Sequence, residues 1–256
     1  MISPSATSGV LARRTFRLAL LYMLTLGLSS TATSQSISLD ERRAVGFMQQ
    51  VWSSSLTLIR VPVSRQRDGQ TRHFTEHCSA VAVTPSPDAL YLSAWHCFDG
   101  YDSSLGQIEM VLRGDERAQI MPMTLLASGG SMTEDWAILR AIDTHYAPPN
   151  WIPVLTHPLS AHQPLMAAGF AALPANDNSD GARRLLFDPD CSLAVSADRP
   201  HATNCAARKG SSGGAVLTMT SSGSPRLVGI ISAGDGSSLS FYYPALFLAD
   251  RISALR

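Results

Sequence analysis

A glycine- and serine-rich stretch from Lys209 to Leu217 holds the residues best suited to chemistry in this chain. Glycine is unfavourable inside helices and strands and serves where the backbone turns sharply, so Gly210-Ser211-Ser212-Gly213-Gly214 is expected to form a tight turn. The apolar run Ala215-Val216-Leu217 then predicts a buried strand. A serine on such a turn can act as a nucleophile when a base lies beside it and free backbone N–H groups face the oxyanion. The simpler alternative is an ordinary glycine–serine turn between two strands.

The order of residues decides between the two serine-hydrolase patterns that this stretch matches. Gly210, Ser212 and Gly214 fit the Gly-x-Ser-x-Gly elbow of α/β-hydrolases, in which the acid and the histidine follow the serine. All seven histidines of this chain precede Ser212; they are His73, His77, His96, His145, His157, His162 and His201. The elbow would therefore lack its base. The other known order, histidine then aspartate then serine, directs attention upstream of the turn.

His96 is the histidine in the most favourable setting. It lies just past two short apolar runs, Cys78–Val83 and Ala89–Ala94, which a proline-containing turn separates, and this pattern predicts a β-hairpin. A disulfide between Cys78 and Cys97 is feasible across that hairpin, because it requires Cα atoms within about 7 Å. Such a bond would also fix the position of His96.

Asp135 is the best candidate for the acid. It stands at the start of the apolar run Asp135–Arg140, which predicts a strand, so its carboxylate is placed to be buried against an imidazole. A turn residue that caps the strand is the alternative. The other acids considered lie in looser settings and fit less well; they are Asp99, Asp102, Asp115 and Asp143.

The elements that must position these residues are mostly short strands. The further strands expected are Leu56–Val63, Gln107–Arg113, Ala118–Leu126, Leu165–Phe170, Leu185–Phe187, Ala215–Met219 and Leu227–Ser232. A polar turn is expected at Arg65–Thr71, a linker at Tyr146–Asn150 and an amphipathic helix at Pro244–Leu255. Many short strands with turns between them predict an all-β sandwich or barrels rather than βαβ units.

The first 34 residues are predicted to be a secretory signal peptide. Arg13, Arg14 and Arg17 precede the apolar run Leu18–Leu28, and the small residues Ala32–Ser34 fit a cleavage site. The run is too short to span a bilayer comfortably, and an uncleaved membrane anchor is the alternative. The mature protein is therefore expected to be secreted or periplasmic, where four cysteines favour two disulfides over a cysteine–metal site.

Charge and composition narrow the possible partners. The formal net charge is zero, which argues against a nucleic-acid partner and against a membrane surface once the signal is removed.

A metal site at His73 and His77 is disfavoured. The two histidines have the spacing of a metal pair only on a helix, and their flanks predict a strand.

Taken together, the motifs carry a family resemblance. The chain resembles the trypsin-like, chymotrypsin-fold serine endopeptidases of the exported bacterial type. Leu92–Cys97 resembles their histidine motif, Asp135–Leu139 their aspartate motif and Gly210–Gly214 their serine motif. Ser232-Ala233-Gly234 resembles the strand that pairs with the substrate backbone.

The resemblance implies an all-β fold of two packed antiparallel six-stranded β-barrels with the site between them, and a C-terminal α-helix. Residues 1–34 would be the signal peptide, 35–145 the barrel that carries the histidine and the aspartate, and 146–256 the barrel that carries the serine, with the helix.

It also implies the role of each residue. Ser212 would attack the scissile carbonyl, His96 would accept its proton, and Asp135 would orient the imidazole. The N–H groups of Gly210 and Ser212 would form the oxyanion hole. The expected protein is a monomer that acts on polypeptides and needs no cofactor or metal. Two alternatives are a protease-fold protein that binds without cleaving and a serine esterase.

Several positions depart from the family's usual pattern. Ala206 falls at the base of the specificity pocket, where it offers no acid to Lys or Arg, so a neutral substrate side chain is expected. Cys191 and Cys205 are expected to pair and to brace the loop before the serine. Ser211 replaces an aspartate that in many relatives binds a newly cleaved N-terminus, so Ser211 is expected to brace the loop by hydrogen bonds instead.

Overall fold

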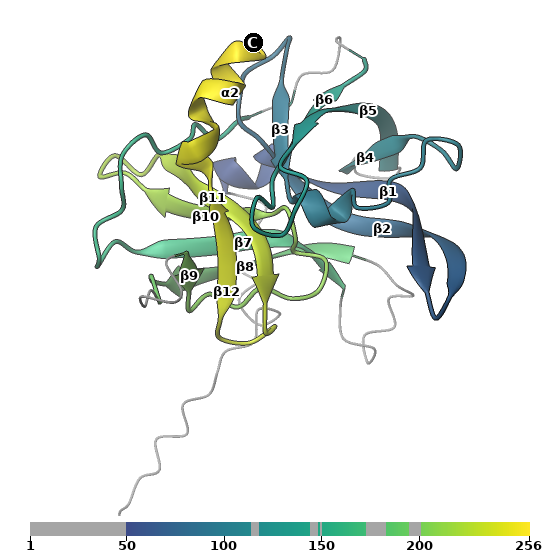
Figure 1. The fold of residues 1–256 in the computed structure, drawn as a ribbon. Helices are drawn as coiled ribbons and strands as arrows, with labels where there is room; N and C mark the ends of the chain where they lie inside the picture. Colours follow the sequence, from purple (N-terminus) through teal and green to yellow (C-terminus); the bar gives the residue numbers. More distant parts are fainter. Residues whose placement is uncertain (1–49, 114–117, 144–147, 149, 173–182, 195–200) are drawn as a thin grey trace, which may run out of the picture. The chain divides into compact units, whose positions relative to one another are not determined.

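The computed structural model describes residues 50–113, 118–143, 148, 150–172, 183–194 and 201–256 (Figure 1). The predicted signal peptide, residues 1–34, lies outside the described residues, as does most of the predicted linker Tyr146–Asn150. Among the described residues, no helix is long and apolar enough to cross a membrane.

The first sheet is a closed six-stranded antiparallel barrel with the strand order β1-β2-β3-β6-β5-β4. Its strands are β1 (Leu56–Arg67), β2 (Gln70–Ala82), β3 (Leu90–Ser93), β4 (Ile108–Arg113), β5 (Ala118–Ser128) and β6 (Ala137–Ala141). β1 pairs with β4 to close it, with Leu58 opposite Val111. Alternate residues of β1, namely Ile59, Val61 and Val63, are fully buried, which is the period-two pattern of a strand with one face in the core.

The second sheet has six antiparallel strands in the order β8-β7-β10-β11-β12-β9. They are β7 (Leu165–Ala172), β8 (Arg183–Cys191), β9 (Ala202–Thr203), β10 (Ala215–Met219), β11 (Pro225–Gly234) and β12 (Ser240–Pro244). An isolated bridge between Leu193 and Thr203 and the disulfide Cys191–Cys205 join its two edges. The all-β prediction is therefore confirmed, with one closed barrel and one sheet that the bridge and the disulfide draw together.

Short helical segments complete the fold. They are η2 (Val51–Ser55), η3 (Trp95–Cys97), η4 (Ala245–Leu248) and α2 (Ala249–Ala254). The predicted C-terminal helix is thus present, but Pro244 ends β12, and a 3-10 turn precedes the α-helical residues. Figure 1 shows η4 and α2 following the end of β12 at the C-terminus.

The hairpin predicted just before His96 is also present, and its first strand, β2, begins earlier than predicted. β2 pairs with β3, with Val81 opposite Leu92, and also runs along the whole of β1. The expected polar turn contracts to Asp68-Gly69, both of which have positive φ (53° and 73°), as in a two-residue hairpin turn. Polar residues that were expected in the turn, including Arg65, therefore belong to strands.

The two sheets share one buried hydrophobic cluster that contains residues of both, such as Val61 and Leu92 from the first and Phe170 and Leu217 from the second. Trp52 packs edge-to-face against Phe187, with ring centroids 5.5 Å apart. Burial of these side chains supplies most of the driving force that holds the sheets together.

Candidate active site

The pairing of β3 with β6 brings His96 and Asp135 together. Ser93, at the end of β3, lies opposite Ala137, at the start of β6, so the residues just beyond these ends become neighbours. The His96 main-chain N–H donates to Asp135 Oδ1 (2.8 Å), and the ring Nδ1 lies 2.8 Å from Oδ2. Two hydrogen bonds from one residue fix both the backbone and the ring of His96.

The Asp135 carboxylate is almost completely buried, with 1% of the residue exposed. It also accepts a hydrogen bond from the hydroxyl of Ser232, which lies on β11 of the second sheet. Three donors compensate for the burial of this charge, which would otherwise be strongly unfavourable. Because a carboxylate only accepts, the neutral imidazole carries its proton on Nδ1, and Nε2 is left with a free lone pair.

A disulfide and the hydrogen bonds of Arg65 support the short helix that carries His96. The disulfide Cys78–Cys97 joins β2 to η3, with Cα atoms 6.3 Å apart, as expected. Arg65 on β1 donates from one guanidinium nitrogen to the His96 carbonyl oxygen (2.8 Å) and from another to the Asp99 carbonyl oxygen (2.8 Å). Glu76 holds the same guanidinium at 3.1 Å.

Arg65 was missed by the sequence reasoning, which placed it in a polar turn. Cross-strand pairing would not have found it, because Arg65 lies opposite Arg72 and Glu76 lies opposite Val61. The Arg65–Glu76 ion pair runs diagonally between the two strands. Only the extension of β1 and β2 past the barrel carries the guanidinium to η3.

The Ser212 turn is held almost entirely by backbone hydrogen bonds. Ser211 N–H donates to the Arg208 carbonyl oxygen (2.9 Å), and Gly214 N–H donates to the Ser211 carbonyl oxygen (2.8 Å). Gly213 N–H donates to Ile231 of β11 (2.8 Å). The expected bracing by Ser211 is thus supplied by its main chain.

Glycine is required at Gly213, whose φ is 77°. A Cβ there would overlap with the Ser79 carbonyl oxygen and Ser93 Oγ, and would lie 3.1 Å from the Ala94 nitrogen. The residue after Ser212 therefore packs directly on the strands that lead to His96. Within the described residues, Ser212 Oγ and His96 Nε2 make no hydrogen bond, a contact that is often loose before substrate binds.

The Lys209–Gly210 peptide of this turn is bound to β7 through its carbonyl oxygen. Ala172 N–H donates to the Lys209 carbonyl oxygen (3.3 Å) at the end of β7. The N–H of a planar trans peptide points opposite to its C=O, so the Gly210 N–H points away from β7. Among the described residues, neither the Gly210 N–H nor the Ser212 N–H donates a hydrogen bond. These are the two N–H groups predicted to face the oxyanion.

A pocket of about 420 Å³ adjoins Ser212. It is lined by Ala207, Arg208, Lys209, Ser212, Ile231, Ala233, Gly234, Asp235 and Gly236. Of the residues predicted to contact substrate, Ala233 and Gly234 line this pocket, whereas Ser232 turns its hydroxyl to Asp135. Ala206 does not line this pocket; it packs near Ala171 and Leu186, and its N–H donates to Asp188 Oδ2 (2.9 Å).

Asp235 is the acidic residue of the pocket lining, and its carboxylate is committed to the adjacent turn. Its Oδ1 accepts N–H groups of Ser237 (2.8 Å), Ser238 (2.9 Å) and Leu239 (3.0 Å). These backbone hydrogen bonds, that of Ser237 first, hold the pKa of Asp235 well below its ordinary range.

The described residues offer one cluster of three possible metal ligands, Cys78, His96 and Cys97, whose ligand atoms lie within 4.8 Å of one another. Both sulfur atoms belong to the disulfide, so the cluster has no thiolate to bind a metal. His73 and His77 lie on the strand β2, as predicted, and not on a helix.

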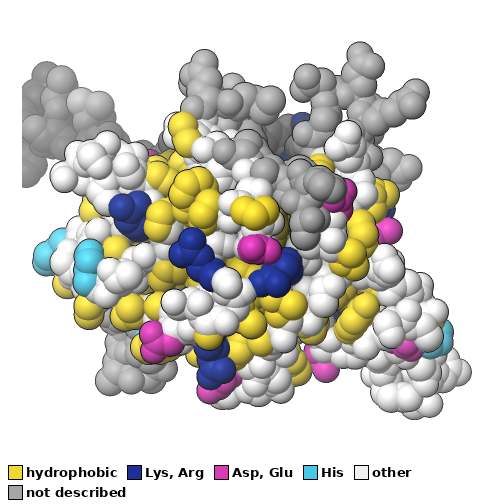
Figure 2. Space-filling view, turned by 90° about the horizontal axis from the view of Figure 1, so that it is seen from above, with side chains coloured by type: hydrophobic (Ala, Val, Ile, Leu, Met, Phe, Trp, Pro, Cys, Tyr) yellow, Lys and Arg dark blue, Asp and Glu magenta, His cyan; other side chains and the backbone are white. Residues whose placement is uncertain are grey.

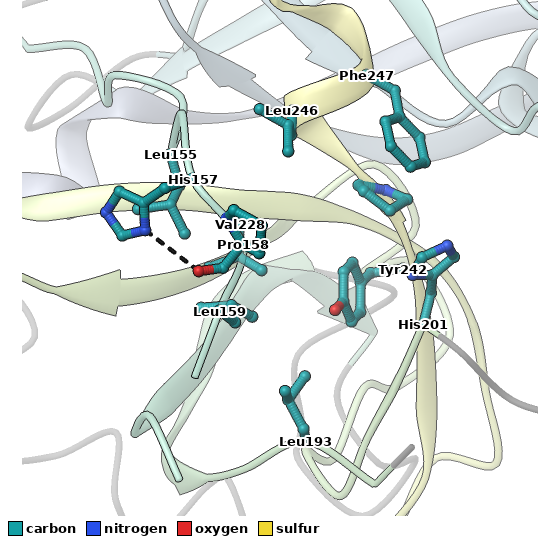
Figure 3. A pocket seen from close by; sticks show the side chains of 11 residues that line it. Leu155, His157, Pro158, Leu159, Leu193, His201, Val228, Tyr242, Leu246 and Phe247 are labelled. Carbon is teal, nitrogen blue, oxygen red and sulfur yellow. Dashed lines mark hydrogen bonds between the residues drawn. The ribbon is translucent and has the colours of Figure 1, made fainter. Parts of the chain in front are cut away.

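A second pocket, of about 310 Å³, lies away from these residues in the second sheet (Figure 3). Its lining is largely apolar and includes Leu155, Val228, Tyr242 and Phe247. Burial raises the pKa of the Tyr242 phenol above its ordinary value. None of His96, Asp135 or Ser212 lines this pocket.

A scan against protein-family models and a search of curated proteins find no match for this chain. Its two six-stranded antiparallel sheets, one closed into a barrel, are consistent with a chymotrypsin-like fold. The assignment of a function therefore depends on the geometry of the site.

Proposed function

We propose that this protein is an exported serine endopeptidase that hydrolyses peptide bonds through His96, Asp135 and Ser212. The observation that carries the proposal is the buried Asp135 carboxylate, which binds both the Nδ1 and the main-chain N–H of His96. A histidine oriented in this way, just past strands that pack against the Ser212 turn, is the arrangement that activates a serine hydroxyl.

The reaction follows from the positions of the donors and acceptors. Ser212 Oγ attacks the carbonyl carbon while its proton passes to His96 Nε2, and Asp135 stabilises the imidazolium that forms. The Gly210 and Ser212 N–H groups donate hydrogen bonds to the negatively charged carbonyl oxygen. His96 then gives the proton to the leaving amine. Water, activated by the same imidazole, releases the acyl group and restores Ser212.

Export and a polypeptide substrate are parts of the same proposal. Two disulfides and the charged-then-apolar N-terminal sequence support a secreted or periplasmic protein. On the face shown in Figure 2, Lys and Arg side chains lie among acidic and hydrophobic ones, whereas a nucleic-acid-binding face would gather basic side chains.

The test is hydrolysis of an unfolded protein substrate by the wild-type chain, Ser212→Ala and Ser211→Ala. We expect Ser212→Ala to lose about a millionfold in kcat, the scale seen when another serine protease loses its nucleophile. Ser211→Ala, one residue away, keeps most of the activity. More than about one per cent of activity in Ser212→Ala would show that the nucleophile is misassigned, given this scale.

The same assay distinguishes an endopeptidase from a protein that only binds polypeptides and from a serine esterase. A protein that only binds polypeptides would show no hydrolysis in any variant. A serine esterase would turn over an ester at Ser212 but not the matching amide at equal concentration. An endopeptidase cleaves both, and both activities disappear together in Ser212→Ala.

A further inference from the structure

Ser79 on β2 makes an unusual set of contacts for a residue outside the proposed triad. It is completely buried. Its hydroxyl donates to the Gly210 carbonyl oxygen (3.1 Å) and accepts the Phe170 N–H of β7 (2.7 Å). Its main-chain N–H donates to the Ser212 carbonyl oxygen (2.7 Å). Its carbonyl oxygen accepts the hydroxyl of Ser93 (2.7 Å).

These four bonds connect three parts of the molecule through one residue. Ser79 and Ser93 belong to the first barrel, Phe170 belongs to the second sheet, and Gly210 and Ser212 belong to the nucleophile turn. All of the polar groups of Ser79 have hydrogen-bond partners, which offset the desolvation of its buried hydroxyl. Removal of the hydroxyl would leave a buried N–H and a buried C=O without this partner.

The bond to Gly210 bears directly on the oxyanion hole. Gly210 has a φ of 97°, and a glycine can adopt conformations on both sides of φ = 0 without steric cost. Its N–H belongs to the peptide whose C=O binds Ala172, and its own C=O is held by Ser79. The planes on both sides of Gly210 are therefore anchored, the first by β7 and the second by the Ser79 hydroxyl.

We propose that Ser79 is a positioning residue that keeps the oxyanion hole in its working geometry before substrate binds. The proposal rests on the endopeptidase function proposed above. Ser79 does not touch the substrate; it acts through the peptides of Gly210 and Ser212. The hydrogen bonds from Ser79 to this turn are neutral and lie within the folded chain, so they require no buried ion pair at Ser211.

The experiment compares Ser79→Ala with Thr84→Ala. Thr84 is a matched control in the first barrel, since its buried hydroxyl also donates to a carbonyl, that of Asp88 (3.2 Å), and accepts a backbone N–H, that of Leu90 (2.7 Å). Both variants lose the same kind of buried hydrogen bonds, so both are expected to melt at a lower temperature. Only Ser79→Ala should lose catalysis.

We expect kcat of Ser79→Ala to fall at least about tenfold, up to the roughly 10²–10³-fold that follows the loss of an oxyanion-hole donor. KM should change little. The affinity for a peptide trifluoromethyl ketone, whose adduct carries an oxyanion, should fall by the same factor as kcat/KM. If Ser79 only stabilised the fold, its loss would weaken the binding of substrate and of the oxyanion analogue alike. The affinity for the analogue would then not fall in step with kcat/KM while KM stayed unchanged.

A milder variant covers the case in which Ser79→Ala does not fold. Ser93→Ala removes only the bond to the Ser79 carbonyl oxygen, and we expect about a two- to fivefold fall in kcat, the scale of one neutral hydrogen bond. If the wild type is active and the Ser79 and Ser93 variants match Thr84→Ala in kcat, the inference is wrong while the function stands. If the wild type itself is inactive, the proposed function is wrong.

Discussion

At the scale of single residues, the site depends on side chains that hold His96 from several directions. Asp135 fixes the ring and the main-chain N–H of His96. Arg65 fixes the carbonyl oxygen of the same residue from the opposite end of its backbone. The position of the imidazole is therefore determined by β1 and the start of β6 as well as by η3.

Arg65 provides the sharpest prediction at this scale. We expect Arg65→Met to lower kcat/KM about ten- to a hundredfold, because the charge-assisted hydrogen bond to the His96 carbonyl oxygen, one of those it removes, is worth about 1.5–3 kcal/mol. The matched control is Arg67→Met. Both guanidinium groups lie over the Phe74 ring, that of Arg65 at 5.5 Å and that of Arg67 at 5.9 Å from its centroid, but Arg67 is on the exposed end of β1. Steady-state kinetics on one peptide would check both variants. Equal kinetics for the two variants would remove Arg65 from the site.

At the scale of elements, the Ser212 turn fits against β2 and β3 because Gly213 has no side chain. We expect Gly213→Ala to abolish activity and to destabilise the fold, since a Cβ there meets Ser79 and Ser93 in addition to the strain of a φ of 77°. Gly223 has nearly the same φ, 76°, and nothing within 4 Å of its Cβ position. Gly223→Ala should therefore lose only about 1–2 kcal/mol in urea unfolding. Similar losses in both variants would contradict the packing argument.

The lining of the pocket beside Ser212 argues against a Lys or Arg side chain of the substrate, which agrees with the expectation of a neutral one. Arg208 and Lys209 line it, and the Asp235 carboxylate is bound to the N–H groups of its own turn. We expect a peptide-library profile dominated by neutral residues before the cleaved bond, and the same profile from Asp235→Asn. Dominant cleavage after Arg, lost in Asp235→Asn, would show that Asp235 is the base of the pocket.

The same elements show what a sequence can and cannot predict here. Local patterns predicted the hairpin before His96, the turn at Ser212 and the strands that follow, because periodicity and turn residues act over a few positions. They did not predict that Ser232 would bind Asp135, that Ala206 would lie outside the pocket, or that Ser79 and Arg65 would reach the site. Those contacts depend on strand register, on the length of β1 and β2, and on how the two sheets meet, which no short window of sequence contains.

At the scale of the whole molecule, the proposed oxyanion hole needs no buried N-terminal ammonium, because Ala172 and Ser79 bind the peptides on either side of Gly210. Arg43-Ala44-Val45-Gly46 faintly resembles an activation-cleavage site, and these four residues lie outside the described residues. We expect a chain that begins at Gln35, with its N-terminus blocked by a short tag, to be fully active without trimming. Activity that appears only after cleavage at Arg43, and that disappears when the Ala44 amine is acetylated, would contradict this prediction.

The central claim is that the fold makes the Ser212 hydroxyl a nucleophile, and a fluorophosphonate tests it most directly. Attack by Ser212 Oγ forms an oxygen–phosphorus bond and releases fluoride, so the adduct marks the activated hydroxyl. We predict one adduct per folded chain, mapped by peptide mass spectrometry to Ser212, and none in the urea-unfolded chain or in His96→Ala. A folded chain that reacts no faster than the unfolded one, or an adduct on another residue, would contradict the account.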